Sequence, residues 1–171
     1  MHFQPTLSNE FVKIVPLSTE DFEDLFTIAS DKLLWGQHPE NNRYQKDVFL
    51  KHFQEAVQSG TAFKVIDVKT GNTIGSTRYY DYHEKEKHLA IGYTFIDRKY
   101  WATPYNRALK NLMINYAFQY VETIIFHVGN TNFRSQKAVE KLGAIHSKTD
   151  VKPDTGKTYF TFSLTKNNWK E

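Results

Sequence analysis

The segment from Arg98 to Arg107 combines cationic side chains with the signals of a helix start. Thr103 can cap a helix, and Pro104 suits its first position because the missing N–H would be unpaired there. The free amides and the positive dipole end of such a helix attract anions, and nearby cations such as Lys99 add to this attraction. We therefore expect an anion site suited to phosphate groups. No G-x-x-x-x-G-K-[ST] or G-x-G-x-x-G pattern occurs, which excludes P-loop and Rossmann sites.

A second polar segment runs from Gly129 to Ser135 and leads into another short helix. Asn132 is placed to cap this helix, and Ser135 shares a helix face with Val139 and Leu142, which points its hydroxyl toward the sheet. A capping asparagine and a small buried serine are also common structural features. From the spacing alone, a structural role and a role in a site both stay open for this pair.

Other reactive groups are few. The chain has no cysteine, which excludes disulfides, thiol nucleophiles and cysteine-based metal sites. His83 and His88 are separated by charged residues at a spacing that differs from H-E-x-x-H and is typical of a surface hairpin. We expect no metal site, and we interpret His127, at the end of an apolar strand, as a structural histidine.

The elements that must position these residues follow from hydrophobic periodicity. Strands are expected at residues 11–15, 63–68, 73–80, 88–96, 123–128 and 159–164. Helices are expected at residues 18–29, 46–58, 104–120 and 133–142. In the helix over 104–120, the apolar stripe runs from Tyr105 to Ala117 and leaves Arg107 and Lys110 on other faces.

The order strand, helix, strand between Leu89 and Val128 implies a right-handed crossover between two parallel strands. Tight turns at 69–72 and 83–87 indicate antiparallel pairing of the strands before it. We therefore predict an α/β (α+β) fold with a mixed, mostly antiparallel sheet, a central parallel strand pair and helices on both faces. The helix start at Thr103 would then lie at the carboxyl end of the first parallel strand.

Length and charge set further bounds. The 171 residues, 40% of them apolar, fit one domain (1–171, core about 11–164). No apolar run approaches the roughly 20 residues that span a bilayer, and the N-terminus lacks a signal core, so we expect a cytoplasmic protein without membrane contact. The net charge is +3, yet residues 98–141 alone carry +5 (seven Lys or Arg against two Glu), which favours a local anionic ligand. Nucleic-acid binding through this segment is the alternative, which we do not favour.

Several motifs occur in order along the chain: Val15-Pro16-Leu17, Ile74-Gly75-Ser76-Thr77-Arg78, Ile91-Gly92-Tyr93-Thr94, Tyr100-Trp101, Tyr116-Ala117-Phe118, and Asn132-x-x-Ser135 with Glu140-Lys141-Leu142-Gly143. In these motifs, and over residues 11–164, the chain resembles the GNAT superfamily of N-acetyltransferases, in the branch that includes ribosomal-protein N-terminal acetyltransferases. The resemblance implies a GNAT-like fold. It also implies acetyl-CoA as the donor, bound between the strands expected at 88–96 and 123–128.

The resemblance further implies the residues that hold acetyl-CoA. Main-chain groups of the first of these strands would bond the pantetheine arm, and the pyrophosphate would lie on the loop from Trp101 to Asn106. The full implied set is Tyr93, Thr94, Phe95, Trp101, Ala102, Thr103, Tyr105, Asn106, Arg107, Asn132 and Ser135. This loop departs from the family pattern, because both glycine-type positions differ and Pro104 cannot donate an amide.

The implied reaction is direct attack of an amine on the thioester carbonyl. It needs a neutral amine, a stabilised oxyanion and protonation of the leaving thiolate. Ser135 is the candidate catalytic group that protonates or orients the thiolate, with Tyr93 and Tyr105 as alternatives. For the amine proton, a water relayed through Asn132, or through Glu84 and His88, is the candidate route. Many relatives carry Glu where this chain has Ala90, so the base that they use is absent.

The implied acceptor is a primary amine on a protein N-terminus or a small molecule. Arg78, Tyr80 and Trp35 are expected to line its site, with Tyr44, Tyr79 and Tyr82 as further candidates and ordinary packing as the alternative for the aromatic rings. Arg78 could select a carboxylate. We expect a monomer or a homodimer. The competing interpretation is a GNAT-like module that binds acyl-CoA without turnover, which the departures from the family pattern favour.

Overall fold

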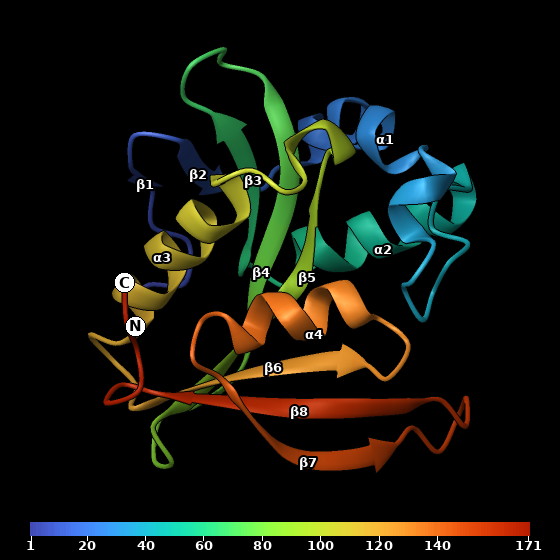
Figure 1. The fold of residues 1–171 in the computed structure, drawn as a ribbon. Coiled ribbons are helices and arrows are strands. Elements are labelled where there is room, and N and C mark those ends of the chain that lie inside the picture. The colour runs from blue at the N-terminus through green and yellow to red at the C-terminus, as the bar shows by residue number, and fades with distance from the viewer.

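The computed structural model of the protein describes residues 1–171. An eight-stranded sheet in the order β1-β2-β3-β4-β5-β6-β8-β7 forms its centre (Figure 1). The strands are β1 (Leu7–Ser8), β2 (Val12–Pro16), β3 (Ala62–Asp67), β4 (Thr73–His83), β5 (His88–Ile96), β6 (Thr123–Gly129), β7 (Ile145–Val151) and β8 (Thr158–Thr165). The helices are α1 (Phe22–Ala29), α2 (Lys46–Gln58), α3 (Tyr105–Ala117) and α4 (Phe133–Glu140), with short 3-10 turns at Thr19–Asp21, Lys32–Trp35 and Arg98–Tyr100.

Strands β5 and β6 form the parallel pair, and all other neighbouring strands are antiparallel. The two strands pair only near their amino-terminal ends, where residues 88–90 face residues 123–125. Beyond these positions they diverge, although β5 continues to Ile96 and β6 to Gly129 (Figure 1). The predicted mixed sheet with a central parallel pair is confirmed, and the ends of this pair separate where α3 and α4 follow.

Helices cover both faces of the sheet, as predicted, and each face has its own apolar core. A cluster of 24 buried residues lies beneath α3 and α4 and includes Leu109, Met113 and Val139. A second cluster of 11 residues lies beneath α1 and α2 and includes Leu25 and Phe49. Consecutive residues of β5 therefore face two different environments. No helix combines the length and the apolar character that crossing a bilayer requires.

Local signals explain the starts of α1 and α4. The Ser18 N–H donates to Asp21 Oδ2 at 2.9 Å and closes the turn that leads into α1. Asn132 Oδ1 accepts the Ser135 N–H at 3.3 Å, so Asn132 caps α4 as predicted. The 3-10 turn before α1 and helix α4 thus each begin where a short polar side chain satisfies a backbone amide that lacks another partner.

Helix α3 is shorter than the predicted 104–120. It begins at Tyr105 and ends at Ala117, and the residues after it form a turn. The Thr103 hydroxyl donates to the Tyr100 carbonyl instead of accepting an α3 amide, so it does not cap the helix as expected. The first turn of α3 is consequently left without a side-chain cap.

Two strands were not predicted, and both lie at the edges of the sheet. β1 has two residues, which is too short for a periodic pattern. β7 (IHSKTDV) is exposed along nearly its whole length and lacks alternating apolar residues. Backbone hydrogen bonds hold β7 against β8, so the pattern of its side chains does not predict the strand.

Candidate functional site

A bulge in β5 lies beyond the point where this strand has left β6. The register with β4 shifts between Ser76 and Arg78, where one β4 residue faces both Tyr93 and Thr94. Tyr93 has a φ of +52°, a left-handed conformation that is unfavourable for tyrosine. The bulge points the Tyr93 ring toward α2, whereas the Thr94 hydroxyl faces α3.

On the α3 side of β5, a chain of hydrogen bonds leads from α3 to β4. Lys110 Nζ donates to Thr94 Oγ1 at 2.7 Å. The hydroxyls of Thr94 and Thr77 are 2.8 Å apart and share a hydrogen bond. The Thr77 hydroxyl also lies 3.3 Å from Met113 Sδ. Each of these three polar side chains therefore has a partner within the protein.

Lys110 corrects a sequence-based expectation. It is 7% exposed, although the predicted stripe placed it on an outer face of the helix. Met113 and Ile114, three and four residues later, are fully buried, so Lys110 lies on the buried face of α3. Leu112 and Tyr116, assigned to the stripe, are only half-buried. Burial lowers the pKa of Lys110 to about 7.

On the α2 side, aromatic and cationic side chains surround the Tyr93 ring. The Arg78 guanidinium carbon lies 3.6 Å from the ring centroid, and the Tyr80 ring meets it edge-on at 5.1 Å. The His52 ring of α2 lies 5.9 Å away. The Tyr80 hydroxyl is hydrogen-bonded to His127 Nδ1 at 2.8 Å. The structure thus brings Tyr93 together with two residues expected to line the acceptor site.

Two arginines provide the charge on this α2 side. Arg43 and Arg78 are 6% and 8% exposed. Burial, with the charges of both guanidinium groups, lowers the pKa of His52 to about 3. Burial and the charge of Arg43 lower the pKa of His38 to about 4. Both imidazoles are therefore neutral near pH 7, and Glu40 is ion-paired with Arg43.

The loop after β5 offers unpaired backbone amides. Those of residues 102, 103, 105, 106 and 107 donate no hydrogen bond within the protein. The first amide bonded within α3 is that of Ala108, which donates to the Pro104 carbonyl at 2.9 Å. Ala102 has a φ of +57°, so the chain turns sharply before the helix. The expected amide donors are thus free to bind a ligand at this helix start.

The cationic side chains near this loop contact other parts of the protein. The Arg107 guanidinium donates to the carbonyl oxygens of Lys141 and Lys170, at 2.8 and 2.6 Å. Arg98 is ion-paired with Asp31. Arg107 therefore has its backbone amide, rather than its guanidinium, available at the expected anion site.

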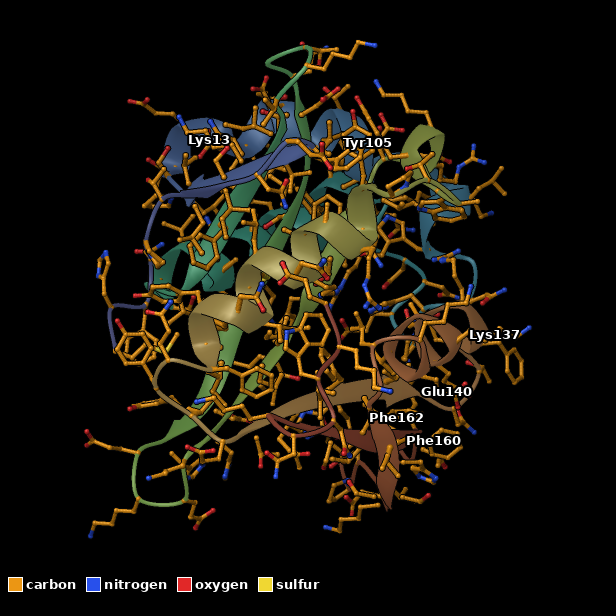
Figure 2. All side chains as sticks on the ribbon, turned by 60° about the vertical axis from the view of Figure 1, so that its left-hand side comes forward. Lys13, Tyr105, Lys137, Glu140, Phe160 and Phe162 are labelled. Carbon is orange, nitrogen blue, oxygen red and sulfur yellow. The ribbon has the colours of Figure 1, made fainter.

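Tyr105, labelled in Figure 2, lies in the first turn of α3. Its hydroxyl donates to Asp67 Oδ1 at 3.0 Å, and the Tyr100 hydroxyl donates to the other oxygen of this carboxylate at 2.9 Å. Burial and the hydrogen bond to Asp67 raise the pKa of Tyr105. The phenol is thus held against β3, so it is the amide of Tyr105 that is free at the loop.

The first turn of α4 meets this loop across the gap between the strand ends. The Arg134 guanidinium carbon lies 3.6 Å from the Trp101 ring centroid, and Trp101 Nε1 donates to the Ile96 carbonyl at 3.1 Å. Ser135 is half-buried, and its hydroxyl has no hydrogen-bond partner in the protein. Asn132 is 6% exposed and uses its side-chain oxygen as the cap.

Trp35, the third expected acceptor residue, lies in the core beneath α1 and α2. It is 2% exposed, and its indole N–H donates to the Ala29 carbonyl at 2.7 Å. The centroid of its ring lies 5.6 Å from the guanidinium carbon of Arg43, so Trp35 makes a cation–π contact with this arginine. Tyr79 and Tyr82 pack on the α3 side of the sheet, away from the Tyr93 ring.

Arg43 and His52 were not identified from the sequence. Arg43 precedes α2 in a polar loop, and His52 lies in the predicted helix outside its apolar stripe. Neither residue belongs to a recognisable motif. Packing of α2 against β4 and β5 brings them to the site, so no local signal could have located them.

Three potential metal ligands meet at the hairpin between β4 and β5. The ligand atoms of His83, Glu86 and His88 all lie within 4.8 Å of one another. His83 and Glu86 are exposed, and His88 Nδ1 lies 3.3 Å from a Glu86 oxygen. The contact between His88 and Glu86 and the pairing of His83 with His88 across the hairpin account for this grouping.

One protein-family model matches most of the chain. A family model described as an acetyltransferase (GNAT) domain matches residues 12–145. No curated protein sequence matches the chain. The match spans all elements from β2 to the start of β7 and therefore includes both diverging strands.

Solved structures share this fold. A probable GNAT-family acetyltransferase from Chromobacterium violaceum superposes with a TM-score of 0.83 at 18% identity, covering 96% of this chain and 87% of its own. A GCN5-related N-acetyltransferase from Brucella melitensis gives 0.81 at 19%, covering 97% and 80%. Spermidine N-acetyltransferase from Vibrio cholerae, in complex with CoA and spermine, gives 0.72 at 14%, covering 94% and 98%. At these identities the likeness establishes the fold alone.

Proposed function

The chain belongs to the family of GNAT acetyltransferase domains, whose members are acyltransferases that use acetyl-CoA, and from this premise we propose that it is an N-acetyltransferase. A single domain transfers the acetyl group to a primary amine on a small molecule or a protein N-terminus. Membership of the ribosomal-protein branch stays a prediction. The observation that carries the proposal is the separation of β5 from β6 beside the bulge at Tyr93.

Three features of the chain fit acetyl-CoA. Residues 93–95 lie on the part of β5 that no longer pairs with β6, so their main-chain groups can accompany the pantetheine arm. The free amides in residues 102–107 suit the pyrophosphate, because helix starts bind phosphate through backbone N–H groups. The first turn of α4 adds Asn132 and Ser135 on the opposite wall. Pro104 removes one amide from this loop but leaves five others.

Acetyl-CoA supplies an activated acyl carbon, and the chain's own residues prepare its transfer. Main-chain groups at the Tyr93 bulge stabilise the developing oxyanion. The Ser135 hydroxyl, which has no internal partner, donates a proton to the departing thiolate. Asn132 fixes the first turn of α4 and so holds Ser135 in place. The N–C bond forms, the C–S bond then breaks, and the proton that the amine nitrogen loses passes through solvent to restore the Ser135 hydroxyl.

The acceptor amine must be neutral when it attacks. Ala90 occupies the position of the base used by many relatives, and the imidazole nearest to Tyr93, that of His52, has a pKa of about 3 and accepts protons poorly near pH 7. We propose that the amine loses its proton to solvent before attack. The rate at low acceptor concentration should then rise with pH until the pKa of the amine itself is reached.

Two measurements test the proposed function. Titration calorimetry measures acetyl-CoA binding, and a thiol reagent measures CoA release with a panel of amine acceptors. Binding together with acceptor-dependent release supports the acetyltransferase. Tight binding without release for any acceptor supports the competing acyl-CoA-binding module, and absence of binding contradicts both. Salt-dependent binding of DNA or RNA would instead support the nucleic-acid alternative.

A further inference from the structure

Arg78 carries a buried charge that the protein does not neutralise. It is 8% exposed, and no carboxylate lies within ion-pair distance of it. Its Nε is buried and has no hydrogen-bond partner. Its Nη1 reaches only the Glu55 carbonyl, at 3.5 Å, which is the outer limit for a hydrogen bond. This guanidinium therefore keeps most of its donors free.

A buried cation in this state is unfavourable, because it has lost water without gaining an anion. Stacking on the Tyr93 ring at 3.6 Å recovers part of that loss and fixes the plane of the guanidinium. The planar guanidinium matches a carboxylate, which can accept two parallel N–H donors. The free donors of Arg78 thus lie beside the bulge at which acetyl transfer is proposed.

The neighbouring groups do not supply the missing anion. Arg43 adds a second positive charge, and Glu40 is already paired with it. The histidines at this side, His52 and His38, have pKa values of about 3 and 4 and are neutral near pH 7. Burial raises the pKa of Tyr80, so its phenol is also neutral. The Asp81 carboxylate acts electrostatically on Tyr80 and His127 but forms no ion pair with Arg78, so the Arg78 guanidinium is left without an anionic partner.

We propose that the acceptor is a small amine that also carries a carboxylate, and that Arg78 binds this carboxylate; the inference rests on the proposed acetyl transfer. The amine then points toward the bulge at Tyr93. The Tyr93 hydroxyl is a further donor for the same carboxylate, because the residue is 40% exposed and its hydroxyl has no internal partner. A polyamine brings only positive charges to Arg43 and Arg78, so this side disfavours it.

The first experiment compares acceptors that differ only in the carboxylate. Glycine with glycinamide and 4-aminobutyrate with butylamine are matched pairs, and spermidine serves as the polyamine. CoA release is measured for each acceptor. Titration calorimetry also measures binding of each acceptor to the protein without acetyl-CoA. We expect at least one carboxylate-bearing acceptor to be preferred over its partner by about tenfold or more in kcat/KM and in affinity.

The second experiment changes Arg78. In Arg78→Met, the KM and Kd of the preferred carboxylate-bearing acceptor should rise about tenfold, whereas those of its uncharged partner should change less than about twofold. Arg78→Lys should recover part of the affinity because it restores the charge. Lys69→Gln is the matched control, since it removes one positive charge from the exposed turn between β3 and β4. Circular dichroism verifies that each variant is folded, and the acceptor comparison in the wild-type protein needs no variant.

The outcomes separate this inference from the proposed function. Turnover of amines without preference for a carboxylate, or equal losses for both members of a pair in Arg78→Met, overturns the inference and leaves acetyl transfer standing. Binding of the carboxylate-bearing acceptor that depends on Arg78, without any CoA release, supports the inference and contradicts the proposed catalysis. Preferred turnover of spermidine also overturns the inference.

Discussion

At the bulge, the two sides of β5 differ in whether their polar side chains have hydrogen-bond partners within the protein. On the α3 side, Lys110, Thr94 and Thr77 bond one another in a continuous chain. On the α2 side, Arg78 and Tyr93 are in contact but leave donors without partners. A polar group that is paired within the fold needs no further partner, whereas an unpaired group in a buried position is available to a ligand. The difference separates residues whose polar groups are satisfied inside the fold from residues that we propose to contact the substrate.

Lys110→Met should give the largest change in stability. The folded pKa of Lys110, about 7, lies below its ordinary value of 10.5, so the unfolded chain binds more protons between these pH values and the wild-type stability rises with pH across this window. Methionine removes the buried amine, so the variant should be more stable near pH 7 by on the order of 3 kcal/mol, and this difference should shrink toward pH 10.

Urea unfolding of the wild type and Lys110→Met, from about pH 7 to pH 10, measures this difference. Both proteins contain the same tyrosines, so the difference between their stabilities isolates the lysine. A difference that stays constant with pH would show that Lys110 is not the buried titrating group described above.

Thr94→Val should have the next largest effect. Valine keeps the branched shape but removes the oxygen that accepts from Lys110 and contacts the Thr77 hydroxyl, so we expect a loss of about 2 kcal/mol. The matched change on the other side is Tyr93→Phe, which removes a hydroxyl without an internal partner and should alter stability by less than about 0.5 kcal/mol. Urea unfolding near pH 7 measures both. Equal losses would remove the distinction between the two sides.

Ser135→Ala extends the comparison to α4. Its hydroxyl also lacks an internal partner, so the change should leave stability nearly unaltered while kcat falls about tenfold, which corresponds to about 1.4 kcal/mol. The Kd of acetyl-CoA should stay within about twofold. Ser147→Ala on the exposed strand β7 is the control. Unchanged turnover in Ser135→Ala would exclude this serine as the proton donor.

His52→Gln should give the smallest effect, visible only in acid. The folded pKa of His52, about 3, lies below its ordinary value of 6.5, so the unfolded chain binds more protons below pH 6.5 and stability falls as the pH falls. Glutamine removes this contribution, which amounts to about 1 kcal/mol over the first pH unit below 6.5. Thermal unfolding from about pH 7 to pH 5 tests it, and identical pH dependence in both proteins would contradict a neutral buried His52.

The central part of the fold could be predicted from the sequence because its signals are local. Alternating apolar residues mark β3 to β5, a short apolar run marks β6, and the order strand, helix, strand requires the parallel pair. The edge strand β7 could not be predicted, because its residues are exposed and its pairing depends on backbone groups. The same reasoning applies to the divergence of β5 and β6, which depends on packing around both strands.

The site could be predicted only in part. The cap signal located Asn132 and therefore the place of Ser135, and alternation along β4 put Arg78 and Tyr80 on one face. Arg43 reaches this side through the tertiary packing of α2, which no local pattern encodes. Lys110 was assigned to the wrong face because periodicity does not define the edges of an apolar helix face sharply. Assigning that face one residue too early or too late places a buried residue on the exposed face.

Tyr93 is the extra residue of β5, and this has a consequence for insertions and deletions. With Tyr93 removed, Gly92 and Thr94 would be consecutive, and Thr94 would still lie opposite its β4 partner with its hydroxyl toward α3. Strand alternation would remain regular, so a chain lacking Tyr93 could keep its sheet and its two cores. It would lose the left-handed residue, the ring beneath Arg78 and the irregular backbone beside the diverging strands. The length of this strand, rather than the type of any one residue in it, therefore distinguishes a sheet that only folds from a sheet that also forms the proposed site.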